Sequence, residues 1–157
     1  MPNMGFEANT ETQRSQNAIA NDAWFVAVNL FEFCKLFGIS KSFSDDILIE
    51  KLIYACDEVN QSLLDYALEQ QANGFNNLAD VPAPQIGGKH VKVTQYKRAV
   101  YAKAKAELIK DKIDMDRKPD AENSARQAAN LSNNYERMAS KAVAYIQNKP
   151  AIGVHVI

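Results

Sequence analysis

The sequence predicts an all-α protein, built as an antiparallel bundle of three long helices with one short helix before them. Apolar residues recur at spacings of three and four along three long stretches, which is the pattern of amphipathic helices. Ser, Pro and Gly stand where these stretches begin and end, and many core positions are alanine, which favours close helix packing. We therefore expect a helical domain at residues 24–150, between an extended arm at 1–23 and a short β-like tail at 151–157.

Size, charge and cysteine content limit the class of protein. The 157 residues, 46% of them apolar, suit one domain with its own core. The 18 Lys and Arg nearly balance the 19 Asp and Glu, so the overall charge does not favour nucleic acid or a membrane as the main partner. No segment approaches the roughly 18 apolar residues of a membrane helix. Cys34 and Cys56 lie in apolar helical patterns, which predicts reduced, buried thiols and no metal site.

The N-terminal part of the domain is expected to hold the short helix. Residues 1–23 are rich in Asn, Gln, Thr and Ala and lack an apolar period, so on their own they should form a flexible arm. In the aromatic segment that follows, Asn29 can cap a helix that runs to Phe37 and stops at Gly38.

The first long helix is predicted from Ser44, its N-cap, to Gly74, its stop. Acidic residues follow the cap, where the helix dipole favours them. We expect its apolar stripe to pack along one partner helix at a shallow angle. The stripe comprises Ile49, Leu52, Cys56, Val59, Leu63 and Tyr66.

The connection after this helix, "LADVPAPQIGG", combines turn residues with three apolar ones: Leu78, Val81 and Ile86. These three side chains either pin the connection onto the bundle or form an exposed patch for another subunit. We favour pinning, because the prolines and glycines can reverse the chain while the apolar residues hold it down.

The second long helix is predicted over 89–113 and has two apolar faces, so it should be central. One face holds Ala99, Ala102, Ala106, Ile109 and Ile113; the other holds Tyr96, Val100, Ala104 and Leu108. Its cations occupy the seams in rows, with Arg98, Lys105 and Lys112 in one row and Lys103 and Lys110 in another.

The third long helix is predicted to open near Pro119 and to end at Pro150. Its stripe comprises Ala128, Leu131, Tyr135, Met138, Ala142 and Tyr145. In the tail that follows, Val154 and Val156 alternate with His155, which is typical of a short strand that needs a partner strand.

No catalytic site is visible. The two histidines, His90 and His155, have no partner that the sequence identifies, and the paired carboxylates lie at helix starts or on expected wet faces. There is no phosphate-binding glycine loop. We therefore expect no enzyme activity, no cofactor and no metal.

The basic helix allows two interpretations. Residues 89–112 contain eight Lys or Arg against two acids, so the helix could face DNA phosphates without sequence preference. Alternatively, the cations are solvated edges of a buried helix. Their distribution over several rows favours the second interpretation, because a helix that follows phosphates usually gathers its charge on one side.

The run "GFNNLADVPAPQIGGKHVKVTQYKRAVYAKAKAELI", residues 74–109, resembles the GPL family of phage head-completion proteins, whose members have a "G…LADVPA…QI" loop leading into "Y.RAVY…AKA.LI". The helix at residues 46–66 and the terminal "GVHVI" are also similar to that family. The resemblance covers roughly residues 43–157, and residues 1–42 match poorly.

The resemblance implies a structural virion protein, added to the portal vertex after DNA packaging, that seals the filled head and offers a surface to the tail. Its implied partners are the portal protein, neighbouring copies in a ring matched to the twelvefold portal, a tail-completion or neck protein, and packaged DNA contacted without sequence specificity. It would act at the neck of the virion and pass through the host cytoplasm during assembly. The alternative function is that of a helical DNA-binding or regulatory protein that uses the basic helix 89–112.

Two groups of residues are candidates for these contacts. Because a ring at the portal would enclose the DNA channel, we expect four cations to lie partly toward DNA: Arg98, Lys103, Lys105 and Lys110. The tail should pair with a strand of a neighbouring protein; its candidate residues are Ile152, Val154, Val156 and Ile157. The alternative is that the tail lies in a groove of its own domain.

Overall fold

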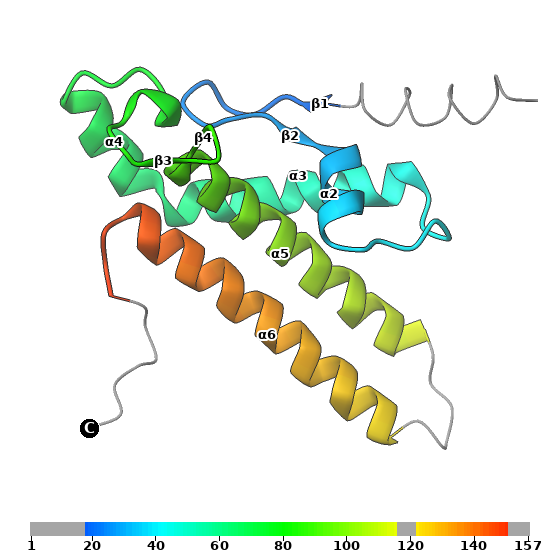
Figure 1. Cartoon of the computed structure of the whole chain (residues 1–157). Helices are drawn as coiled ribbons and strands as arrows, with labels where there is room; N and C mark the ends of the chain where they lie inside the picture. The colour runs from blue at the N-terminus through cyan, green and yellow to red at the C-terminus, as the bar shows by residue number, and fades with distance from the viewer. Residues whose placement is uncertain (1–17, 116–121, 151–157) are drawn as a thin grey trace, which may run out of the picture.

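A computed structural model describes residues 18–115 and 122–150 (Figure 1). This part of the chain is mostly helical and contains two small antiparallel sheets of two strands each. The elements are, in order, β1 (Ala18–Ile19), β2 (Val28–Asn29), α2 (Leu30–Leu36), α3 (Asp45–Ser62), α4 (Leu64–Ala72), a 3₁₀ turn (Leu78–Asp80), β3 (Gln85–Ile86), β4 (Lys89–His90), α5 (Val91–Met115) and α6 (Glu122–Ile146).

The central position of α5 is confirmed. It packs against α6 on one side and α3 on the other, and α5 and α6 run side by side in opposite directions (Figure 1). Ala99, Ala102 and Ala106 are fully buried on one face, and Tyr96 and Val100 on the other. Alanine at the contact lets the helix backbones approach closely.

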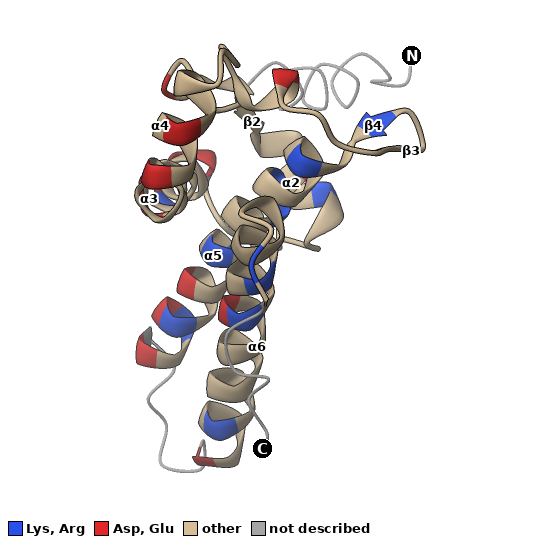
Figure 2. Cartoon of the chain, turned by 90° about the vertical axis from the view of Figure 1, so that its left-hand side faces the viewer, with Lys and Arg blue, Asp and Glu red and all other residues tan. Residues whose placement is uncertain are grey.

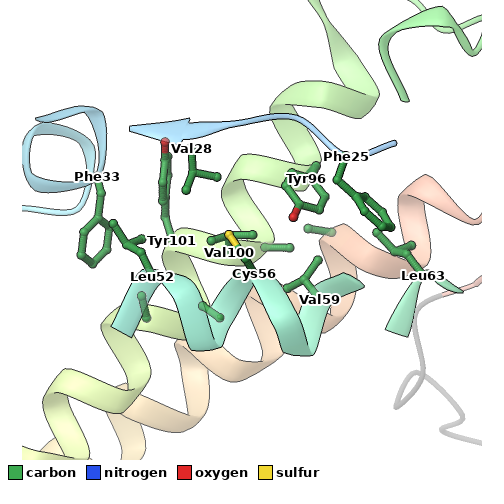
Figure 3. Close-up of a cluster of buried hydrophobic side chains, with 14 of the residues drawn as sticks. Phe25, Val28, Phe33, Leu52, Cys56, Val59, Leu63, Tyr96, Val100 and Tyr101 are labelled. Atoms are coloured by element: carbon green, nitrogen blue, oxygen red, sulfur yellow. The ribbon is translucent and has the colours of Figure 1, made fainter. Parts of the chain in front are cut away.

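The long helix predicted from Ser44 crosses α5 obliquely, so the expected shallow packing angle is not observed (Figures 1 and 2). Its N-cap is confirmed, because the Ser44 side chain accepts a hydrogen bond from Ile47 N–H. The helix crosses α5 instead of lying along it because α5 covers only part of its apolar stripe. The N-terminal segment, residues 18–36, contributes Phe25, Val28 and Phe33 to the same buried cluster (Figure 3). The stripe therefore packs against this segment as well as against α5.

The predicted single helix is interrupted at Leu63, where α3 ends and α4 begins. The Ser62 hydroxyl donates to Glu58 O at 2.9 Å, a bond to the preceding turn that bends helices. The Ser62 carbonyl accepts instead from Gln147 Nε2 at 3.0 Å. The bend leaves Leu63 and Tyr66 both buried.

The N-terminal segment fills an aromatic core, which we define as Trp24, Phe25, Phe33, Tyr96 and Tyr101 with the buried leucines around them (Figure 3). Phe25 stacks on Tyr96 with ring centroids 5.4 Å apart, and Phe33 lies 5.5 Å from Tyr101. The predicted short helix is confirmed as α2, with Asn29 as its N-cap and Gly38 at a positive φ of 59° just after its end.

A network of partly buried hydrogen bonds fixes the start of this segment. Asn21 Nδ2 donates to the Tyr96 hydroxyl at 2.6 Å and to Val26 O at 2.9 Å. The Tyr96 hydroxyl donates to Asn60 Oδ1 at 2.6 Å, and Asn60 Nδ2 donates to Asn21 Oδ1 at 2.9 Å. Residues 18–23, which the sequence placed in the arm, thus form β1 and a turn bonded to α3 and α5; residues 1–17 lie outside the described part of the chain.

The connection after α4 is pinned down at two of its three apolar residues. Leu78 and Val81 are buried, and Leu78 N–H donates to Trp24 O at 2.9 Å. The pinning prediction is wrong for Ile86, which is 71% exposed. Residues 85–90 form a hairpin whose turn, Gly87 and Gly88, has φ of 60° and 73°, and this places Ile86 on an exposed strand.

The stripe predicted on the last helix is only partly correct. Leu131 and Tyr145 are each 46% exposed, while Ser132, Ala139, Ala142, Ala144 and Ile146 are buried. The α5–α6 contact selects small side chains, and Ser132 Oγ donates to Ala106 O across it at 3.1 Å. Larger residues are therefore displaced to the edges. The predicted start at Pro119 lies outside the described residues.

Candidate functional surfaces

Two of the four DNA-channel candidates are neutralised by carboxylates. Lys103 Nζ lies 2.8 Å from Glu58 and 3.2 Å from Glu136, and Lys110 Nζ lies 2.8 Å from Glu107 and 3.1 Å from Glu136. Glu136 of α6 thus bridges two lysines that lie about two turns apart on α5. This row holds helices together.

The protonation of this cluster follows from its contacts. Burial raises the pKa of Glu136, but the hydrogen bonds and charges of Lys110 and Lys103 outweigh burial, and the net pKa is lowered. For Lys110, the hydrogen bond to Glu107 contributes most to a raised pKa. Glu136, Lys103 and Lys110 are therefore ionised at neutral pH.

The other two candidates belong to a different row. Arg98 is exposed and Lys105 is half-buried, and within the described ranges neither forms an ion pair. Burial, and then repulsion from Lys112, lowers the pKa of Lys105. This row consequently has positive charge that no carboxylate of the described chain offsets.

Two hollows border this row. One, of about 580 Å³, is lined by Leu108, Ile113 and Leu131 with Lys105 and Lys112 beside them. The other, of about 680 Å³, is lined by residues of α2, β4, α5 and α6, including Leu36, Lys89, His90, Arg98 and Met138. Both are open, mostly apolar depressions with cations at their margins.

The β3–β4 hairpin projects beside the second hollow and is held at its base by hydrogen bonds. His90, for which the sequence identified no partner, donates from Nε2 to Val81 O at 2.7 Å and accepts at Nδ1 from Val93 N–H at 3.3 Å. Val91 N–H also donates to Pro84 O at 3.0 Å. His90 is thus a structural residue at the base of the hairpin.

The opposite side of the molecule is acidic. Residues 45–72, which form α3 and α4, contain seven Asp or Glu and one lysine, Lys51. In Figure 2, acidic residues gather on α3 and α4 at the left, and the lysine of β4 lies on the projecting hairpin at the right. The balanced overall charge hides this division.

Sequence comparisons identify the family of this chain. The model of the phage head completion protein (GPL) family matches residues 19–157. The chain belongs to this family. A head completion/stabilization protein of Escherichia phage P2 is 38% identical over 93 residues, which are 59% of this chain and 55% of the relative. A probable head completion/stabilization protein of Haemophilus phage HP1 is 29% identical over 91 residues, which are 58% of this chain and 61% of the relative.

These alignments span little more than half the length of the two GPL-family relatives. No solved structure matches the chain. The GPL model begins at Ile19, the second residue of β1, so it includes the aromatic segment and α2, which lie outside the resemblance over residues 43–157.

The remaining predictions concern the C-terminal tail, a metal site, a membrane helix and the two cysteines. The tail candidates Ile152, Val154, Val156 and Ile157 lie outside the described residues. Within residues 18–115 and 122–150, no cluster of His, Cys, Asp or Glu could hold a metal, and no helix is both long and apolar enough to cross a membrane. Cys56 is a buried free thiol whose pKa burial raises to about 11, and Cys34 is half-buried.

Sequence reasoning missed one buried cation. Lys92 is buried and donates to the Tyr66 hydroxyl at 2.7 Å, with its ammonium 5.1 Å from the centre of that ring. It joins the first turn of α5 to α4. The sequence did not predict its burial, because a lysine in the first turn of a helix is normally solvated.

Proposed function

We propose that this protein is a structural component of a phage virion that completes the DNA-filled head. The observation that carries this proposal is the family match over residues 19–157, most of the chain. The two relatives, named for head completion and stabilization, support it.

In finer terms, the protein joins the portal vertex after packaging, closes the filled head and presents the surface on which the tail, or a tail-completion or neck protein, assembles. A rigid core with unlike outer sides suits a part that must contact several proteins without a catalytic step. Deleting its gene should leave DNA packaging intact but yield heads that lose DNA and carry no tails. Nuclease protection and electron microscopy measure both properties; normal tailed, infectious particles without the protein would contradict the proposal.

For DNA contact, the proposal separates the four candidate cations. Arg98 and Lys105 are the pair whose charge is available, whereas Lys103 and Lys110 are engaged with carboxylates. Arg98→Gln with Lys105→Gln should reduce DNA retention in heads that still contain the protein. Lys103→Gln with Lys110→Gln is the matched control and should mainly lower stability; equal retention by both variants would defeat the DNA assignment.

The alternative, a regulatory DNA-binding protein, makes a different prediction. Native mass measurements of the protein with the portal, with and without DNA, separate the two. Head completion predicts a complex with the portal that forms without DNA, and a free protein that is monomeric or weakly associated. A stable ring of the pure protein, or a complex with DNA alone, would contradict this account.

The C-terminal tail provides a further test. We propose that residues 151–157 pair with a strand of a neighbouring virion protein. Truncation after Pro150 should then preserve helical content and melting temperature but prevent incorporation into heads. If the tail instead fills a groove of its own domain, truncation should cost about 1–3 kcal/mol per large apolar side chain, and an early-melting protein that still assembles would disprove intermolecular pairing.

A further inference from the structure

The two sides of the molecule are complementary in charge. The acidic side is α3 and α4, as described above. Away from that side, Lys89 of the β3–β4 hairpin and Arg98 and Lys105 of α5 form no ion pair within the described residues, and the hairpin projects at the side opposite α3 and α4 (Figure 2). Charges of this kind oppose contact between like sides of two copies and favour contact between unlike sides.

The outer face of α4 combines apolar and acidic groups. Leu64 and Leu68 are 46% and 55% exposed, and their spacing of four places them on the same face of the helix. Asp65 and Glu69 have the same spacing and border this pair. No ion pair within the described chain involves either carboxylate.

The hairpin presents the matching groups. Ile86 has the largest exposed fraction among the large apolar residues of the described chain. Lys89, its cross-strand partner, is exposed and forms no ion pair within those residues. The turn and the hydrogen bond of His90 hold the hairpin, so Ile86 and Lys89 stay side by side on its two strands.

We propose that the β3–β4 hairpin of one copy docks on the outer face of α4 of a second copy, with Ile86 between Leu64 and Leu68 and Lys89 facing Asp65 and Glu69. The inference deepens the proposed function and rests on it, since it names the surfaces that neighbouring copies share. The two surfaces differ, so the contact is head-to-tail, and every added copy leaves one surface of each kind available.

The orientation of the two surfaces within one copy is fixed. The hairpin leads directly into α5, and Lys92 in the first turn of α5 donates to Tyr66 of α4. Each copy in a head-to-tail series therefore repeats the same geometry. A hairpin tip on one helix face buries far less than the roughly 1,200–2,000 Å² of a stable interface, so the contact needs copies that a larger assembly already holds together.

Crosslinking tests this contact. Filled heads are prepared with the Ile86→Cys/Leu68→Cys double variant and treated with a short bis-maleimide. Head-to-tail docking predicts a ladder of crosslinked multimers. Each single variant should give no more product than the unmodified protein, which carries the same native Cys34 and Cys56.

Charge reversal provides the matched control. Lys89→Glu in the double-cysteine protein should remove the ladder, and adding Asp65→Lys and Glu69→Lys should restore it. Lys141→Glu changes an exposed lysine of α6 and should leave the ladder intact. Circular dichroism verifies that each variant keeps its helices.

The outcomes separate this inference from the proposed function. The inference is overturned if heads contain the protein but give no ladder, if Ile86→Cys alone gives dimers, or if the hairpin crosslinks to another virion protein. Absence of the unmodified protein from filled heads would instead count against the proposed function. In that case, a mixture of the two single variants crosslinked at high protein concentration tests the contact by itself: a mixed dimer that Lys89→Glu removes supports it, and dimers of one single variant alone overturn it.

Discussion

The two ends of α5 and α6 differ in what stabilises them. At one end, the aromatic core joins α5 to α3 and the N-terminal segment through fully buried side chains and a partly buried hydrogen-bond network. At the other end lies the distal helical pair, which we define as residues 109–115 and 122–131. None of its described side chains is buried, and its links to the rest include an ion pair between Lys51 and Asp111.

This difference indicates that the two ends have separate roles, which we call the division of labour: the core supports the exposed surfaces, and the distal pair contributes little to stability. Contacts between segments far apart in sequence make the core a rigid block, and that block determines how α4 and the β3–β4 hairpin are presented. The described side chains of the distal pair are half-buried or exposed, so this pair depends more on helix propensity and surface ion pairs, which contribute little each. Substitutions should therefore affect stability very unequally along the same two helices.

The largest expected effect is that of truncating a core leucine. Leu52→Ala removes a fully buried side chain between the N-terminal segment and α5 and should lower the free energy of unfolding by about 2–5 kcal/mol. Leu131→Ala in the distal pair makes the same chemical change at a half-exposed site and should cost less than about 1 kcal/mol. Urea unfolding followed by circular dichroism measures both, and equal losses would contradict the division.

A smaller loss of unfolding free energy is expected when only the hydrogen bonds of the Tyr96 hydroxyl are removed. Tyr96→Phe keeps the ring that stacks on Phe25 but removes the hydroxyl that joins Asn21 to Asn60. Leaving these half-buried amide groups without this partner should cost about 1–3 kcal/mol. Tyr54→Phe, at an exposed site on α3, is the control and should be nearly neutral. A neutral Tyr96→Phe would mean that stacking alone fixes the N-terminal segment.

The smallest effect concerns the bridge between α5 and α6 and depends on pH. The net pKa of Glu136 is lowered in the folded protein, so its ionisation adds stability above its unfolded pKa, and this is lost as pH falls through the lower folded pKa. Glu136→Gln should cost at most about 1 kcal/mol at neutral pH, because the cluster is partly solvated. The difference should shrink in acid.

Thermal melts of this variant and the original protein at neutral and acid pH measure that change. Glu122→Gln, at an exposed position in the first turn of α6, serves as the control. A Glu136→Gln penalty that stays constant into acid would show that packing, and not the charge of Glu136, determines its effect.

Local signals in the sequence predicted the helices well. Asn29 and Ser44 act as the expected caps, and Gly38 and Gly74 have the positive φ of helix stops. The two apolar faces of α5 correctly placed it at the centre. These features depend on neighbours a few residues apart, which is why spacing alone reveals them.

Features decided by tertiary contacts were not predictable. At the break at Leu63, the carbonyl of Ser62 accepts a hydrogen bond from Gln147, which lies 85 residues later in the chain. The exposure of Ile86 depends on the hairpin, because the residue is apolar like its buried neighbours Leu78 and Val81. Among the candidate cations, Lys103 and Lys110 differ from Arg98 and Lys105 through carboxylates that include Glu58 of α3 and Glu136 of α6, and spacing along α5 does not reveal where these lie.

Hydrogen exchange of the free protein and of the protein in filled heads tests the division of labour most directly. We predict that amides of α3 and of α5 around Tyr96 to Ala104 exchange slowest in the free protein and change little in heads. The β3–β4 hairpin, α4 and the distal helical pair should exchange faster in the free protein, and the hairpin and α4 should become protected in heads. Protection that appears in the core while the hairpin and α4 remain unchanged would contradict the account.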